Sequence, residues 1–161
     1  MKLQLPSSVL SSQDLKAATL EIQRYVQWYG QTLVKIKKSN HKGYEAPAIS
    51  RQAIEIIEQW QGDQPINQPS LDKLITALQD YAAQAPRIAI TLAAPPPRGL
   101  KQELADWCRK NIDAGVLVDF QFDSTMLGGM AVRYGSHIYD WSFRRQILVA
   151  RSHFPEVLRR V

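Results

Sequence analysis

The sequence predicts an α+β protein with a helical N-terminal domain and a small α/β C-terminal domain. Up to residue 86, apolar residues recur at the three- and four-residue spacing of helices. From residue 87 the pattern changes to short, β-branched stretches that are interrupted by a proline-rich link. We therefore predict about three helices over residues 1–86, followed over 87–161 by a mixed sheet of βαβββα type.

Composition is that of a globular protein, because 45% of the 161 residues are hydrophobic and 22% are charged. No apolar run is long enough to span a membrane, and the N-terminal segment lacks the apolar core of a signal peptide. Cys108 is the single cysteine, so no internal disulfide is expected. The net charge of +5 is uneven, since residues 87–161 carry eleven basic and seven acidic side chains.

Three helices are expected in the first domain. The first runs from about residue 12 to 38, with Ser11 or Ser12 as its N-cap. The second begins after Ser50 as N-cap and ends before Gly62, and the third begins at Ser70 and ends at Pro86. Their apolar stripes either pack on one another or accept helices of a partner. The stripe residues chosen as candidate partner contacts are Leu15, Ile22, Leu71, Leu74, Ile75 and Leu78.

The second domain opens with a strand, a helix and a strand. Residues 87–94 are apolar and β-branched, 94–97 form the rigid Ala-Pro-Pro-Pro link, and 98–111 return to helical spacing. Residues 116–122 alternate with period two, which predicts a half-buried strand. Such a unit crosses over right-handedly, so the two strands should be parallel.

The segment from residue 123 to 147 is the most distinctive part of the sequence. It predicts a strand over 130–134, a Gly135-Ser136 hairpin turn, a return strand over 137–139, and Asp140 as N-cap of a last helix. In that helix we expect Phe143, Ile147, Ala150 and Phe154 to be buried. Gly128-Gly129 forms a β-bulge, a close approach to another backbone or an ordinary turn, and the glycines alone favour the turn.

The residues of this segment carry a family resemblance. Leu127, Gly128, Gly129, Arg133, Gly135, Asp140, Ser142 and Arg144 stand at fixed spacing. Together with the order of elements over residues 87–147, this pattern resembles the C-terminal signature of the delta subunit of F-type ATP synthases, whose mitochondrial member is the oligomycin-sensitivity-conferring protein. Ser124, Ser136 and Trp141 depart from the usual residues. The helical part is also shorter than the family's N-terminal bundle.

The resemblance implies a non-catalytic stator subunit of the peripheral stalk, which resists rotor torque and needs no cofactor or metal. Its N-terminal domain would bind N-terminal helices of the alpha subunits, and its C-terminal domain would bind C-terminal helices of the b subunits. Membrane association would come only through the complex, on the cytoplasmic, matrix or stromal side. The signature residues would be architectural, whereas Arg144, Arg145 and Arg151 are candidate contacts for an acidic stalk helix.

Two other functional classes remain open at this point. The arginines and a pI near 9.4 suit a nucleic-acid-binding or general adaptor module, although no known recognition motif appears. Independent catalysis has little support, because the sequence PPPRGLK is not a phosphate-binding loop and His41, His137 and His153 lack metal-ligand spacing. Cys108 reads as a core residue, and Ser142 has no base evident in the sequence.

Overall fold

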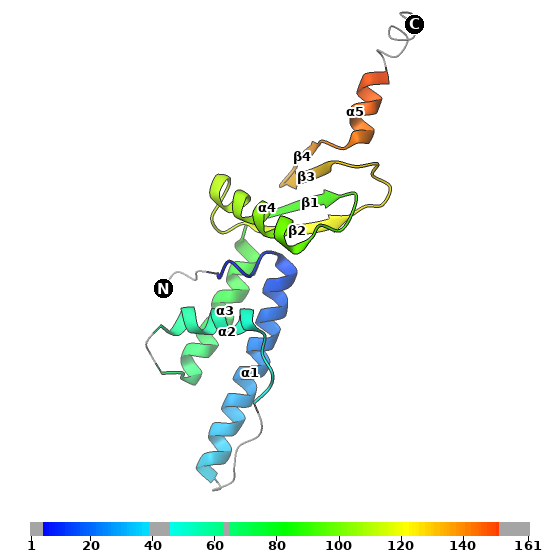
Figure 1. Ribbon diagram of the computed structural model, residues 1–161. Coiled ribbons are helices and arrows are strands. Elements are labelled where there is room, and N and C mark those ends of the chain that lie inside the picture. The colour runs from blue at the N-terminus through cyan, green and yellow to red at the C-terminus, as the bar shows by residue number, and fades with distance from the viewer. Residues whose placement is uncertain (1–4, 39–45, 63–64, 152–161) are drawn as a thin grey trace, which may run out of the picture. The chain divides into compact units, whose positions relative to one another are not determined.

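A computed structural model describes residues 5–38, 46–62 and 65–151 (Figure 1). The chain divides into two compact units, residues 1–85 and 86–161, which we call the N-terminal unit and the C-terminal unit. The first is helical and the second combines helices with a four-stranded sheet. The predicted α+β fold class is therefore confirmed.

The N-terminal unit consists of α1 (Ser12–Lys38), α2 (Arg51–Gln61) and α3 (Gln68–Gln84). Helix α1 packs mainly on α3, and the two lie side by side in Figure 1. Their stripes meet in a core that also takes in α2 and Val9, which precedes the first helix. The fully buried larger side chains of this core are Val9, Leu15, Ile22, Ile56, Leu71, Leu74 and Leu78.

Polar residues set the starts of these helices. The Ser11 hydroxyl accepts from the Asp14 N–H at 3.1 Å, while the Asp14 carboxylate accepts from the Ser11 N–H, which is a reciprocal cap. The predicted cap at Ser50 is confirmed, since its side chain accepts from Ala53 N–H. The predicted cap at Ser70 is wrong: Asn67 accepts from the Ser70 N–H at 2.8 Å. The helix can start earlier because Pro69 is tolerated in its first turn.

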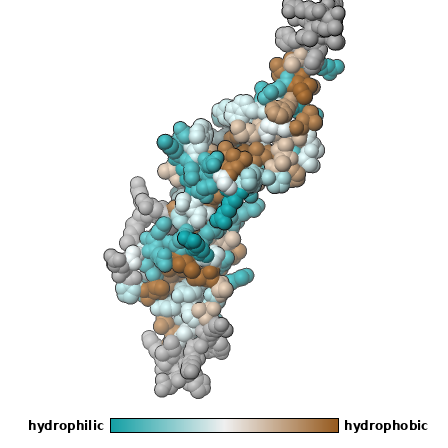
Figure 2. All heavy atoms as spheres, viewed as in Figure 1, coloured by the Kyte–Doolittle hydropathy of each residue, from teal (hydrophilic) through white to brown (hydrophobic). Residues whose placement is uncertain are grey.

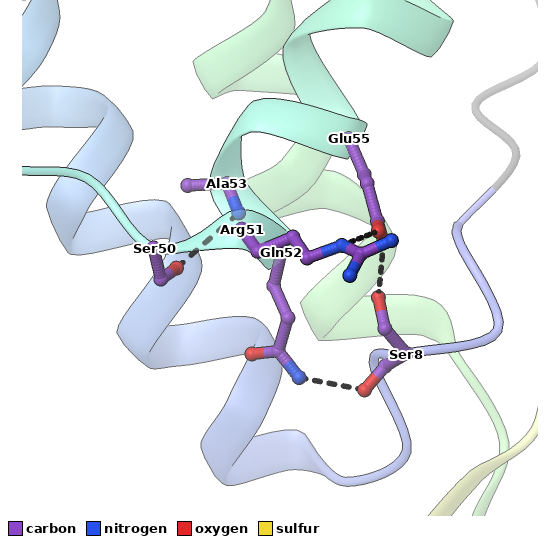
Figure 3. Close-up of polar contacts among 6 residues, drawn as sticks. All are labelled: Ser8, Ser50, Arg51, Gln52, Ala53 and Glu55. Atoms are coloured by element: carbon purple, nitrogen blue, oxygen red, sulfur yellow. Dashed lines mark hydrogen bonds and ion pairs between the residues drawn. The ribbon is translucent and has the colours of Figure 1, made fainter.

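The segment before α1 is fixed to α2 by side-chain contacts (Figure 3). The Ser8 hydroxyl donates to Glu55 Oε2 at 2.7 Å, and Gln52 Nε2 donates to the Ser8 carbonyl at 2.6 Å. Arg51 Nε also donates to Glu55 Oε1 at 3.0 Å. The hydrogen bond from Ser8 and the neighbouring Arg51 lower the pKa of the Glu55 carboxyl. These contacts hold the chain where Val9 can enter the core.

The C-terminal unit is built around a mixed sheet. Its elements are β1 (Arg87–Leu92), α4 (Arg98–Asn111), β2 (Leu117–Phe122), β3 (Met130–Tyr134), β4 (His137–Asp140) and α5 (Phe143–Ala150). The strand order is β2-β1-β3-β4, with β1 parallel to β2 and the other neighbours antiparallel. The predicted parallel crossover and the two-residue turn at Gly135-Ser136 are both confirmed.

Strand register gathers the apolar side chains on one face. Ile90 pairs with Phe120 on one side and with Val132 on the other, and Ile88 pairs in the same way with Val118 and Tyr134. Paired residues of neighbouring strands point to the same side of a sheet. The opposite face is mixed: it carries Arg87, Thr91, Asp119, Gln121 and Arg133 together with the apolar Leu117 and Ile138. One face of the sheet is therefore apolar and needs cover.

Helix α4 covers only part of that apolar face. It packs on β2, where the Lys101 ammonium lies 5.8 Å from the centre of the Phe120 ring. Ala105 and Cys108 of α4 are buried, which confirms the expectation that Cys108 is a core residue.

The expectation for the last helix is wrong, because no residue of α5 is buried and Phe143 and Ile147 are about half exposed. Phe154 lies outside the described residues.

Candidate partner-binding site

Next to α4, the apolar face of the sheet is open as a groove of about 560 Å³. Its floor comes from β1 and β3, one wall is α4, and the far rim is formed by β4 and the residue after it. A volume of this size is typical of ligand-binding clefts. We call this the α4–β4 groove; its lining consists of Ile88, Ile90, Leu104, Trp107, Cys108, Ile112, Met130, Val132, Tyr134, Tyr139 and Trp141.

Aromatic side chains stand on both sides of the groove. On the far rim the rings of Tyr139 and Trp141 stack, with 5.8 Å between their centres and 13° between their planes. Both remain half exposed, and Trp107 on the α4 wall is 59% exposed. Half-exposed aromatic side chains around an apolar floor are typical of surfaces that bind a partner. Figure 2 shows hydrophobic side chains on the C-terminal unit, continuing toward α5.

Gly128 and Gly129 lie against the residues that join β4 to α5. A Cβ atom on Gly129 would lie 2.4 Å from the Trp141 carbonyl oxygen and 3.0 Å from Ser142 Cα. One on Gly128 would meet the Phe143 ring. Both residues also have positive φ, 147° and 81°. The ordinary-turn interpretation was therefore wrong, and the glycines are needed for a close approach of two backbone segments.

Hydrogen bonds complete this contact. The Phe143 N–H donates to the Gly128 carbonyl at 3.1 Å, and the Trp141 N–H donates to the Met130 carbonyl at 2.9 Å. We call the contact of Gly128 and Gly129 with residues 141–143 the glycine clamp. It determines where α5 leaves the sheet.

A hydrogen bond between Asp140 and Ser142 stabilises the segment that contacts the two glycines. Asp140 Oδ1 accepts from the Ser142 N–H at 2.8 Å, as expected, and the pKa of its carboxyl is lowered by the hydrogen bonds from Ser142 and by Arg145. The prediction that Asp140 is the N-cap of the last helix is nevertheless wrong, because that cap is Ser142, whose hydroxyl accepts from the Arg145 N–H. Asp140 therefore forms a tight turn before the cap. Ser142 is 5% exposed, so the sequence motif positions a helix rather than a reactive hydroxyl.

The remaining signature residues differ in their surroundings. Gly135 has a positive φ of 58° at the hairpin turn, where glycine is required. Arg133 pairs with Ala89 and Ile138 on the sheet face opposite the groove and is exposed. Arg144 is exposed on α5 and helps Thr125 to lower the pKa of the Asp123 carboxyl, although the hydrogen bonds from Thr125 are the larger cause.

Arg145 and Arg151 are exposed, as a partner contact requires, and they extend from the clamp to the end of α5. Beside them on the same helix, Phe143, Ile147, Leu148 and Val149 are between 49% and 66% exposed. Helix α5 therefore presents apolar and cationic side chains together. That combination is suited to an amphipathic helix with acidic flanks.

The stripe residues of the N-terminal unit are placed differently. Leu15, Ile22, Leu71, Leu74 and Leu78 are fully buried, and Ile75 is half buried. The alternative that the stripes pack on one another accounts for this burial. A partner would instead meet a shallow groove of about 370 Å³ between α1 and α3, where Leu20 is exposed next to Lys16 and Ala82. Sequence periodicity did not single out Leu20, because it lies beside the stripe.

Trp107, Tyr139 and Trp141 were also not selected from the sequence. A usable signal was present, since β3 and β4 place Tyr134 and Tyr139 on the face already occupied by Ile88 and Ile90, and Trp141 follows β4 directly. One helix cannot cover so much apolar surface.

Among the described residues no group of three His, Cys, Asp or Glu side chains could hold a metal ion. His41 and His153 lie outside those residues.

Comparison with known proteins identifies the family. Residues 68–153, just over half of the chain, match the family described as ATP synthase delta (OSCP) subunit. The chain belongs to the ATP synthase delta subunit family. The match includes the whole glycine clamp and the α4–β4 groove, and it begins at the first residue of α3.

Individual relatives agree with this assignment. A protein named ATP synthase subunit delta from Anaeromyxobacter sp. (strain Fw109-5) is 35% identical over 71 residues, 44% of this chain and 40% of the relative. A protein of the same name from Anaeromyxobacter dehalogenans (strain 2CP-1 / ATCC BAA-258) is 38% identical over 61 residues, 38% of this chain and 34% of the relative. The chain thus matches less than half of the length of these curated relatives.

No described helix has the length and apolar character of a membrane span.

Proposed function

We propose that this protein is a peripheral-stalk subunit of an F-type ATP synthase, which joins the catalytic head to the stalk and resists rotor torque. It has no catalytic role of its own in this proposal. The observation that carries it is the α4–β4 groove beside an exposed helix, in the part of the chain that matches the delta family. A stator needs wide surfaces that hold two larger bodies without slipping.

The α4–β4 groove is suited to the end of a b-subunit helix. An amphipathic helix inserts side chains spaced three and four residues apart into an apolar groove. Met130 and Val132, which are partly exposed, offer an apolar floor, while Trp107 and Trp141 offer aromatic walls. Aromatic side chains at the centre of an interface commonly carry most of the binding energy.

The arginines of α5 would set the position of that helix. Arg144, Arg145 and Arg151 are exposed on a unit that carries a net positive charge. Acidic residues on the flank of a stalk helix would pair with them, and such pairs fix register and partner choice more than they add affinity. The proposed partner is therefore a helix with one apolar stripe and an acidic side.

The N-terminal unit is proposed to contact the N-terminal helices of the alpha subunits. The shallow groove between α1 and α3 is a candidate for that contact, since Leu20 is exposed there and Lys16 supplies a positive charge at its edge. Most of this unit lies outside the matched part of the family, which begins at residue 68. This half of the proposal therefore depends on the groove itself.

Co-purification from the native organism under mild detergent tests the proposal. The tagged chain should bring down alpha, beta and b subunits. In a Trp107→Glu variant, b should be lost because a carboxylate would stand on the wall of the groove. Asp106→Ala is the matched control, since Asp106 is the exposed neighbour on α4 and is absent from the groove lining. Recovery of none of the three subunits would reject the assignment.

Nucleic-acid binding remains a second candidate because exposed, stacked Tyr139 and Trp141 stand near the arginines of α5. Stacked aromatics with nearby cations can bind single strands. Titration with duplex DNA and single-stranded RNA at two salt concentrations separates the two functions. Tight binding that weakens steeply with salt would favour this candidate over the stator role.

A further inference from the structure

The apolar face of the sheet has room for a second helix beside α4. Packed helices lie about 8–10 Å apart and neighbouring strands about 4.8 Å apart, so one helix covers roughly two strands. Helix α4 packs on β2, and the groove opens over β3 and toward β4. A sheet with one apolar face is normally buried by a full layer of helices. The groove is thus the vacant position of a second helix.

The chain itself contains a helix that could fill this position. Helix α5 is amphipathic, is about 12 Å long by its eight residues, and buries none of its side chains. Phe143 and Ile147 are one helical turn apart and are half exposed. The helix begins two residues after Trp141, which lines the groove. Because so short a link gives a very high effective concentration, a freely jointed α5 would be expected to occupy the groove.

The link is not freely jointed, because the glycine clamp fixes each of its residues. Trp141 continues the ladder to Met130, and Phe143 donates to the Gly128 carbonyl. Ser142 is held between them by the Asp140 carboxylate and is buried. These contacts set the direction of the first turn of α5. Folding the helix back over β3 would require them to break.

We infer that the glycine clamp holds α5 out of the α4–β4 groove, which keeps the groove open for a partner. The clamp thereby prevents the protein's own last helix from covering the groove. The statement that a partner later fills the groove rests on the proposed function. The statement that the clamp keeps α5 away concerns this chain alone.

The purified protein tests this inference without any partner. Gly129→Ala places a Cβ atom against the Trp141 carbonyl and should open the clamp. Nuclear Overhauser contacts between the Ile147 methyl groups and those of Val132 or Leu104 should be absent in the original protein and appear in the variant. Gly99→Ala is the matched control, because its Cβ would meet no atom within 4 Å and it has no positive φ. It should behave as the original protein.

A second pair of variants guards against simple loss of folding. Asp140→Ala with Ser142→Ala removes the hydrogen bond that holds Ser142 beside the clamp and the N-cap bond of α5 without adding an atom, and should give the same new contacts. Adding Ile147→Glu and Leu148→Glu to Gly129→Ala should abolish the contacts and restore binding of an apolar dye to the groove. The inference is overturned if α5 stays away from the groove in both clamp variants. Failed co-purification of b, with closure observed, would reject only the stator role.

Discussion

The two units differ in how much of their apolar surface they cover themselves. In the N-terminal unit, Leu15, Ile22 and Leu74 are fully buried where the stripes of the helices meet. In the C-terminal unit, Trp107, Trp141 and Ile147 remain about half exposed or more. Both units have amphipathic elements, so the sequence patterns alone look alike. The difference is that the first unit supplies enough helices to cover its own core and the second does not.

This comparison shows where a partner is needed. A side chain that is buried within its own unit stabilises that unit and is unavailable for contact. A contiguous patch of apolar side chains that stays exposed in a folded unit, unlike a single exposed residue, marks an interaction surface. By this criterion the strongest candidate surface is the α4–β4 groove with α5, and the groove at Leu20 is the smaller one.

The largest expected effect is on the core of the N-terminal unit. Leu74→Ala should destabilise it by about 2–5 kcal/mol, because the cavity lies among fully buried neighbours. Thermal unfolding followed by circular dichroism measures the change. Leu20→Ala is the control, and as an exposed substitution it should stay within about 0.5 kcal/mol. If Leu74→Ala and Leu20→Ala lowered the stability equally, the distinction between buried core residues and exposed apolar residues would not hold.

Loss of the cap on α5 should have an intermediate effect. Ser142→Ala removes the acceptor for the Arg145 N–H and should destabilise the helix by about 1 kcal/mol. Hydrogen exchange should become faster at amides of α5 while those of β1 and β3 keep their protection. If the strands lost protection as well, the clamp would be part of the core rather than a local joint.

Trp107→Ala should change stability much less than Leu74→Ala, although tryptophan is the larger residue. Its side chain is mostly exposed in the isolated unit, so little burial is lost. Its effect should instead appear as loss of b in co-purification. Denaturant titration beside the co-purification separates the two readouts. A loss as large as that of Leu74→Ala would mean that the groove is closed in solution.

The smallest expected effect is the response of the clamp to acid. The folded-state pKa of Asp140 is lowered from its ordinary value of 3.8, chiefly by hydrogen bonds from Ser142. The stabilisation of the folded state by the ionised Asp140 carboxylate is therefore present above about pH 3.8. It is lost as the pH falls through the lower pKa that this carboxyl has in the folded protein. Carboxyl chemical shifts give the titration directly. Asp140→Asn should leave the clamp amide signals insensitive to pH in this range.

Much of the local structure could be predicted from residue patterns. The helix over 98–111, the parallel crossover and the Gly135-Ser136 turn were correct, because spacing, proline and glycine act over a few residues. The cap at Ser70 was wrong because Asn67 competes for the same helix start with Pro69 in its first turn. The burial of Phe143 and Ile147 was wrong because a stripe on a helix does not say that another element covers it.

By itself, the sequence determined the α+β class, the order of helices and strands, and the family resemblance that the comparison bears out. Only the tertiary structure decided which stripes are covered and what the two glycines do. The physical reason is that periodicity fixes which side chains share a face, whereas cover depends on elements distant in sequence. Gly129 meets Trp141 and Ser142 across a strand, a turn and a return strand, and no local pattern specifies that distance.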